Sequence, residues 1–480
     1  MLNDAATGVS QFSSDDATRS IWNKFIRTAE TFNVPGKFTA LTGFEWTSMP
    51  NGNNIHRVVI FADGVEKTSQ VLPYTVFDSD DPEDLWNYLH MYEQKTGGMA
   101  LAIPHNGNVS NGFMFSDKDA KGNKLTNEYA IKRMRWEPII EVTQMKGDGE
   151  THPFLSPDDE FADYETWAVS NLTGTVPKEN WMLQHEYGRS ALKLGLKIGA
   201  ETGANPFKFG LSGATDSHTG LATSREENYF GKYAKTEPKA KRHDYEVIPA
   251  VNPDLRIMTS QELASGLTAV WSRENTRQAI VDGMKRKEVY ATTGTRMRVR
   301  LFAGWDFKAD EVVRPDFAKQ GYLRGVPMGG DLMNAPSGQS PKFMVRALRD
   351  PDGANLDRIQ IIKGWLDSKG ETHERIYDVA VTDGRKIGKD GRCKTPVGST
   401  VDIDKATYTN TIGEAVLTAF WEDPDFDPKL NAFYYVRVLE IPTPRWTTYD
   451  AAYYGVKRPD KVPATTQDRA YTSPVWYTPK

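Results

Sequence analysis

The spacing of apolar residues changes near residue 296, and this change constrains the fold more than any other feature of the sequence. Before it, segments with helical spacing alternate with short apolar segments, which predicts βαβ units and a mainly parallel sheet or barrel. After it, short β-branched and aromatic segments are separated by Gly, Pro, Asp and Asn, which is typical of an antiparallel sandwich. The sequence therefore predicts an α/β chain with a barrel domain over 1–297 and a C-terminal antiparallel β-sandwich domain over 298–480.

The clearest single element is a helix at 15–32. Trp22, Ile26 and Ala29 recur at three-to-four spacing, and Pro35 with Gly36 ends the pattern. Further predicted helices span 81–95, 178–196 and 274–288. Strands are predicted in the first part at 38–44, 56–61, 99–103, 137–143 and 207–214, and in the second at 298–302, 342–348, 358–365, 415–421 and 432–441.

The composition excludes several classes of protein. Lys and Arg number 59 against 64 Asp and Glu, a net charge of −5, so there is no overall signal for nucleic acid. One local basic segment, 224–248, is either a solvated loop or a mobile lid beside a site. Cys393 is the single cysteine, which excludes an intrachain disulfide and a cysteine-based zinc site. The sequence contains no run of 18 apolar residues, so it predicts no membrane span.

Residues that can bind a metal follow the predicted strands of the first part. His105 comes after strand 99–103, and Asp216 and His218 come after strand 207–214. The ends of parallel strands are where barrel active sites collect, and a spacing of two in an extended segment puts both side chains on one side. Glu45 ends strand 38–44, where a carboxylate is costly unless it is paired or metal-bound, and His56 begins the next strand.

The predicted metal ligands are Glu45, His56, His105, Asp216 and His218, and all but His56 are also predicted to be catalytic. Oxygen and nitrogen ligands without a thiolate suit zinc, manganese or iron. Two such divalent ions, bridged by Glu45, would activate a shared water and neutralise charge on a phosphoryl or carbonyl oxygen. Two structural alternatives stay open: a salt bridge for Glu45 and a hydrogen-bonded core position for His56.

The candidate substrate-binding residues are Arg57, Asn106, Asn108, Glu141 and Lys146. Arg57 and Lys146 are expected to bind an anionic group, while Asn106 and Asn108 are expected to orient the substrate. Glu141 lies inside an apolar strand, so it either faces the site or is bonded to a neighbouring loop.

This set of residues resembles the PHP superfamily, named for polymerase and histidinol phosphatase. Gly-Phe-Glu-Trp at 43–46 looks like its bridging glutamate motif, Pro-His-Asn at 104–106 like its strand-end histidine, and Asp-Ser-His at 216–218 like its closing Asp-x-His. The resemblance implies a PHP-like distorted β/α barrel that holds two or three divalent metal ions and hydrolyses phosphoesters.

A closer resemblance covers nearly the whole chain and is to the bacterial family called domain of unknown function 3604. The similar stretches lie at 35–48, 54–57, 104–108, 141–147, 214–220, 290–296 and 472–479. Together they are specific, whereas any one alone would be weak.

One departure from the superfamily pattern concerns its opening motifs. No His-x-His occurs in this sequence, and no Asp-His pair precedes Glu45. We therefore expect an N-terminally incomplete barrel, either because the natural protein has lost several βα units or because this copy lacks them. A periplasmic or secreted location would follow only if a signal peptide precedes the missing part.

The preferred hypothesis is a metal-dependent hydrolase that uses a metal-activated water on a small or polymeric anionic ester, in the first place a phosphoester. One alternative is a ligand-depleted, non-catalytic binding protein, with aromatic residues of the sandwich contacting a glycan. Another keeps the metals but hydrolyses an amide, a carbamate or a sulfate ester. The sequence leaves the oligomeric state open.

Overall fold

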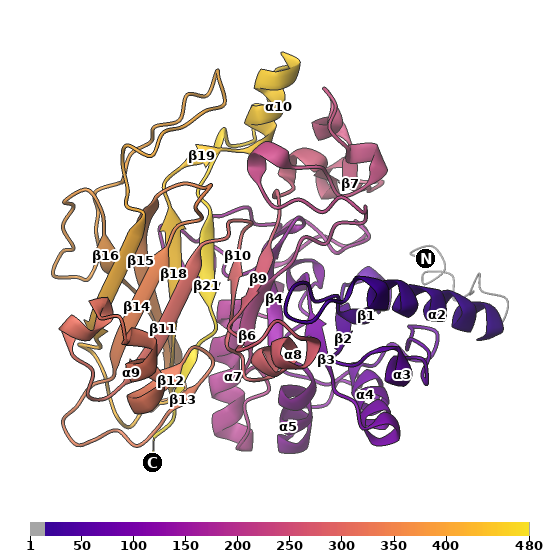
Figure 1. Ribbon diagram of the computed structural model, residues 1–480, viewed down its shortest axis with the longest axis horizontal. Helices are drawn as coiled ribbons and strands as arrows, with labels where there is room; N and C mark the ends of the chain where they lie inside the picture. The colour runs from indigo at the N-terminus through magenta and orange to yellow at the C-terminus, as the bar shows by residue number, and fades with distance from the viewer. Residues whose placement is uncertain (1–14, 480) are drawn as a thin grey trace.

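The computed structural model describes residues 15–479, which form a mixed α/β structure with helices gathered over the N-terminal part and long strands over the C-terminal part (Figure 1). The helices are α2 (Asp15–Phe32), α3 (Val65–Thr68), α4 (Pro82–Thr96), α5 (Asn127–Trp136), α6 (Asn180–Leu183), α7 (Gly188–Thr202), α8 (Arg277–Lys285), α9 (Phe317–Arg324) and α10 (Trp446–Tyr454). No helix in the described range is long and apolar enough to cross a membrane.

The strands up to the predicted domain boundary are β1 (Thr42–Trp46), β2 (Arg57–Phe61), β3 (Ala100–Pro104), β4 (Ile139–Gln144), β5 (Gly147–Asp148), β6 (Gly210–Gly213), β7 (Glu246–Ile248), β8 (Ile257–Met258), β9 (Leu267–Val270) and β10 (Val289–Thr292). Those after it are β11 (Arg298–Gly304), β12 (Gly325–Pro327), β13 (Asp331–Leu332), β14 (Lys342–Leu348), β15 (Leu356–Leu366), β16 (Thr372–Val381), β17 (Val416–Glu422), β18 (Ala432–Glu440), β19 (Thr443–Pro444), β20 (Thr465–Thr466), β21 (Arg469–Thr472) and β22 (Val475–Tyr477).

Helices α2 and α4 form where the local signals placed them. Helix α2 buries Trp22 and Ile26, two of the residues that defined its apolar face. Helix α4 begins after Asp81, whose side chain accepts a hydrogen bond from the backbone N–H of Glu83, and ends at Gly97 in the left-handed conformation. The helix predicted at 178–196 is two helices, α6 and α7, instead of one.

The prediction for the first part is wrong about the direction in which its strands pair. Strands β1, β2 and β3 form an antiparallel sheet with β2 in the middle, whereas a mainly parallel sheet was expected. Strands β4 and β6 are parallel, as a βαβ unit requires. The sheets of the described residues do not close into a barrel, and β1 lies at the edge of its sheet.

Two sheets face each other in the C-terminal part (Figure 1). An eight-stranded sheet runs in the order β13-β22-β18-β21-β10-β9, with β15 on β18 and β16 on β15, and a four-stranded sheet runs β12-β11-β14-β17. Apolar residues from both, such as Leu301, Val345, Ile361 and Val436, share one core. Strand β10 pairs with β21, so the larger sheet continues across the predicted boundary at 297/298.

A buried group of charges joins the two parts, and we call it the junction network. It consists of Glu150, Asp159, Arg189, Glu374 and Arg437. Arg189 of α7 forms ion pairs with Glu150 at 2.7 Å, with Asp159 at 2.8 Å and with Glu374 of β16 at 3.0 Å. Arg437 of β18 pairs with Asp159 at 2.6 Å. Helix α7 also packs against β15 and β16, so the network lies inside a shared core.

A second charged group near the junction contains buried carboxyl groups whose pKa values are raised. Burial and the negative charge of Asp468 raise the pKa of Glu226 to about 8, and burial raises the pKa of Asp468 to about 6. Both groups therefore bind protons more tightly in the folded than in the unfolded chain. Their contribution to stability is full below the unfolded-state pKa and is lost as the pH rises through about 6 for Asp468 and through about 8 for Glu226.

We predict that Glu226→Gln is progressively more stable than the wild type as the pH rises from about 5 to about 8, because the amide cannot ionise in this buried position. Thermal unfolding of both proteins across this range measures the difference in melting temperature. Glu201→Gln, on the exposed side of α7, is the control and is expected to follow the wild type. A Glu226→Gln curve parallel to the wild-type curve would show that Glu226 does not titrate as described.

Candidate metal centre

Three neighbouring strands bring Glu45, His56 and His105 together at one end of their sheet. In the antiparallel register Trp46 pairs with Arg57, and Arg57 with Pro104. The end of β1, the start of β2 and the end of β3 therefore lie side by side at the same end of the sheet. The backbone N–H of His105 also donates to the carbonyl of His56 at 3.3 Å. Antiparallel pairing is what makes a residue before β2 a neighbour of residues at the ends of β1 and β3.

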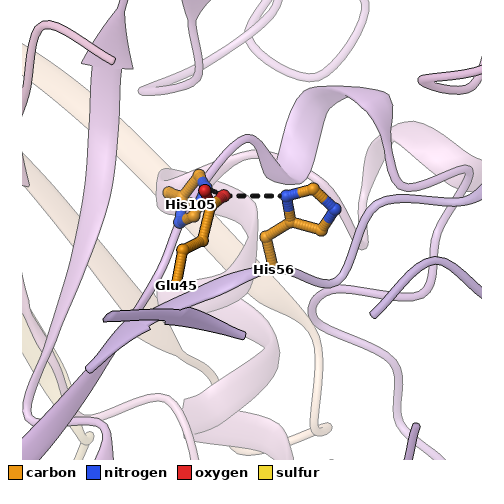
Figure 2. A group of neighbouring side chains, drawn as sticks. All are labelled: Glu45, His56 and His105. Atoms are coloured by element: carbon orange, nitrogen blue, oxygen red, sulfur yellow. Dashed lines mark hydrogen bonds and ion pairs between the residues drawn. The ribbon is translucent and has the colours of Figure 1, made fainter. Parts of the chain in front are cut away.

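The three side chains converge on one carboxylate oxygen (Figure 2). Glu45 Oε1 lies 3.0 Å from His56 Nδ1 and 2.9 Å from His105 Nε2. Their candidate ligand atoms all lie within 4.8 Å of one another. The imidazoles are buried, but the Glu45 side chain is 34% exposed. The cluster is therefore fixed by the sheet on one side and open to a ligand at the carboxylate.

The arrangement favours ligand forms at Glu45 and His56 but not at His105. Burial disfavours the charged carboxylate, but hydrogen bonds from His105 and His56 outweigh it and hold the pKa of Glu45 well below its usual range. Burial lowers the pKa of His56 to about 4 against the opposing effect of Glu45. Burial also opposes a charge on His105, yet its hydrogen bond to Glu45 raises the pKa. The cluster thus offers an ionised carboxylate and at least one neutral imidazole at neutral pH.

The outer ring nitrogens of His56 and His105 have no fixed protonation state within the described residues. A histidine that binds a metal through one nitrogen carries its proton on the other. His56 Nε2 and His105 Nδ1, the nitrogens that point away from Glu45, are buried and have no hydrogen-bond partner among the described residues. Nothing in that part of the chain therefore fixes the opposite tautomer, and the donor set of two imidazoles and one carboxylate fits zinc, manganese or iron.

Asp216 and His218 lie in a different setting from the one predicted. Asp216 follows β6 in the left-handed conformation, with φ at 52°, and its Oδ2 atom accepts hydrogen bonds from the ammonium groups of Lys146 and Lys232. His218 Nε2 lies 3.2 Å from Asp216 Oδ1. Asp216 remains within electrostatic range of His105, but the compact ligand group does not include it. Metal binding by Asp216 and His218 stays a prediction.

Arg57, at the start of β2, is buried in an ion pair with Glu137. Its side chain is 2% exposed, and Nε donates to Glu137 Oε1 at 2.9 Å. Glu137 also accepts from Arg133 and from the indole of Trp86, each at 2.9 Å. A buried carboxylate already pairs with the charge of Arg57 in this structure, and binding of an anionic substrate group by Arg57 stays a prediction.

Asn106 and Asn108 hold the loop after β3. Gln144 Nε2 donates to Asn106 Oδ1 at 2.7 Å, and Asn108 Nδ2 donates to the carbonyl of Lys146 at 2.9 Å. Both asparagines are buried, so they connect the His105 loop to the β4–β5 turn. Asn54, which sequence reasoning did not single out, donates to the carbonyls of His105 and Asn106 and completes this support.

Glu141 and Lys146 lie beside the histidine cluster. Burial raises the pKa of Glu141 to about 7, and its charge interacts with His105 and with Asp216. Lys146 interacts electrostatically with Glu45, and the carboxylate of Asp216 raises its pKa despite the burial. Glu141 is therefore within electrostatic range of His105, and its role in binding a substrate stays a prediction.

The basic segment at 224–248 contributes residues that the sequence reading missed. Lys232 is buried against Asp216, and Arg242 is buried in a bidentate pair with Asp450, at 2.6 and 2.8 Å. Glu262, close to this segment in space, accepts from Tyr229 at 2.5 Å, and burial raises its pKa to about 7. No local pattern marks Lys232, because its partner lies on another loop. Neither the solvated-loop nor the mobile-lid reading describes these two buried cations.

Gly43 lets β1 approach β2 closely enough to place Glu45. A Cβ atom at Gly43 would collide with the carbonyl oxygen of Val59 on β2. We predict that Gly43→Ala costs about 1–3 kcal/mol of stability, as overpacking does, and weakens metal binding because β1 must shift. Chemical denaturation and metal titration measure both effects. Gly220→Ala, where the added atom meets open space, is the matched control; equal behaviour of the two variants would refute this role.

Comparison with known proteins gives one result for nearly the whole chain. Residues 3–479 match the model of a family described as "Protein of unknown function (DUF3604)". A search of curated proteins found no match. The match agrees with the sequence stretches that pointed to this family, while the wider superfamily rests on the motifs alone.

Proposed function

Because the chain belongs to DUF3604, a family of proteins of unknown function, we propose its function from the site itself: metal-dependent hydrolysis, in the first place of a phosphoester. The observation that carries the proposal is the placement of Glu45 Oε1 within 3.0 Å of two imidazole nitrogens at an open sheet edge. Glu45, His56 and His105 would hold the ion.

The position of each remaining residue near the cluster indicates the role that it would have in hydrolysis. A divalent ion bound at the cluster would lower the pKa of a coordinated water and polarise an ester oxygen. Lys146, beside Glu45, would bind an anionic oxygen of the substrate. Glu141, with its pKa raised to about 7, is placed to accept or donate a proton near His105.

The choice of a phosphoester is supported by the motif resemblance to the PHP superfamily and by the cationic neighbours of the cluster. The same residues would serve a sulfate ester, an amide or a carbamate, because the metal chemistry is shared. A ligand-depleted binding protein would keep substrate affinity without turnover. These alternatives differ in what the protein hydrolyses, so a substrate panel separates them.

The test is hydrolysis by the full chain after metal removal and after reloading with Mn²⁺, Zn²⁺ or Fe²⁺. Chromogenic phosphomonoesters, phosphodiesters, sulfate esters and anilides make up the panel. The proposal expects hydrolysis of a phosphoester that is lost on chelation and restored by one of the ions. Bound metal with no turnover of any substrate would favour the binding protein, and turnover of another ester or amide would change the substrate class.

A further inference from the structure

The carboxylate of Asp216 accepts hydrogen bonds from two lysine ammonium groups. A second metal ion at this position would need the carboxylate to be free. Its Oδ2 accepts from Lys146 and from Lys232, and Lys232 also donates to the backbone carbonyl of Asp216 at 2.6 Å. The other oxygen faces His218. Both carboxylate oxygens are therefore engaged, and a metal ion on either would have to displace a group that already bonds to it.

The two lysines have little freedom to leave. The side chain of Lys232 is 1% exposed and that of Lys146 is 9% exposed. Lys232 is further held because the backbone N–H of His218 donates to its carbonyl at 3.0 Å, which ties the 216–218 turn to the segment that carries the lysine. A divalent cation beside two fixed ammonium groups would meet like charges in a buried place, where screening by water is weak.

We propose that Lys146 and Lys232 take the place of a second metal ion at Asp216, so that the site holds one metal ion, and that Lys146 binds the anionic oxygen of the substrate beside it. This rests on the proposed function, since it assigns the charge that completes the same site. It differs from the expectation of two or three ions.

Lys146 is the lysine placed to meet a substrate. It lies on the turn between β4 and β5, and its charge interacts with Glu45 and with His56 of the histidine cluster. Within the described residues its ammonium group donates to Asp216 alone, so two of its three N–H groups are free for a ligand. Lys232 is a positioning residue, because it reaches the site through Asp216. The ligand class is a tetrahedral oxyanion carried by an ester.

The first experiment counts bound metal by titrating the metal-free full chain with Mn²⁺. The wild type is expected to bind one ion per chain, and His218→Ala is expected to bind one as well, because the half-exposed His218 is not a ligand here. Two or more ions in the wild type, with one lost in His218→Ala or in Asp216→Asn, would overturn the proposal. No bound ion in the wild type would overturn the proposed function, and this inference with it.

The second experiment measures binding of inorganic phosphate to the Mn²⁺-loaded protein by calorimetry. Lys146→Met is expected to bind phosphate at least about tenfold more weakly, since it loses a charge-assisted hydrogen bond, and still to bind one Mn²⁺. Lys235→Met, which changes an exposed lysine of the basic segment 224–248, is the control and should match the wild type. Phosphate binding by Lys146→Met at wild-type strength, with its one Mn²⁺ in place, would contradict the role of Lys146.

Discussion

His105→Ala is expected to bind Mn²⁺ or Zn²⁺ more than about 100-fold more weakly than the wild type. Substituting a residue that only contacts a metal ligand already lowers metal affinity about 10–100-fold, and His105 is itself a proposed ligand. His105 supplies one of the two buried imidazoles on Glu45 Oε1, at 2.9 Å. Without His105, Glu45 and His56 provide two ligands, whereas a typical catalytic zinc site has about three protein ligands. Calorimetric titration of the metal-free protein measures the loss.

The matched control is His90→Gln, which removes an exposed imidazole in α4. It is expected to bind metal as the wild type does, with the same melting temperature. Near-ultraviolet circular dichroism of His105→Ala checks that the variant is folded. Wild-type metal affinity in a folded His105→Ala protein would show that the ion is held elsewhere.

Arg437→Met is expected to destabilise the protein by about 3–5 kcal/mol, the cost of leaving buried charges without their partner. Arg437 is fully buried in the junction network, and it donates to Asp159 at 2.6 Å and to Gln360 at 2.9 Å. Its loss leaves Asp159 with Arg189 as its remaining cation. Urea denaturation measures the change in the free energy of unfolding.

A double-mutant cycle separates the charge from the packing. Arg437→Met combined with Asp159→Asn is expected to cost less than the sum of the two single changes, because the pair is removed together. Lys405→Met breaks an exposed ion pair with Asp402 and is expected to leave the melting temperature unchanged. Additive costs in the cycle would contradict the coupling.

Helices α2 and α4 could be read from the sequence because their signals are local. The apolar face of α2 and the Asp81 cap of α4 each lie within a few residues of the element they define. The antiparallel pairing of β1, β2 and β3 could not be read in this way. A short apolar strand has the same pattern whichever way its neighbour runs, so pairing direction depends on contacts far along the chain.

The candidate metal centre was predictable to the same extent. Glu45, His56 and His105 were found because each stands at the end or start of an apolar strand. The lysines on Asp216 were not found as its partners, since Lys146 and Lys232 come from two different loops and only the fold brings them together. The ion pair of Arg57 was not found for the same reason, because its buried partner Glu137 is 80 residues away.

The most direct measurement is anomalous X-ray diffraction from crystals soaked in Mn²⁺ or Zn²⁺. The account predicts a peak about 2.0–2.2 Å from Glu45 Oε1, His56 Nδ1 and His105 Nε2, as expected for metal–ligand bonds. It predicts no second peak on Asp216, where the ammonium groups lie. A fully soaked crystal with no peak between Glu45, His56 and His105 would contradict it.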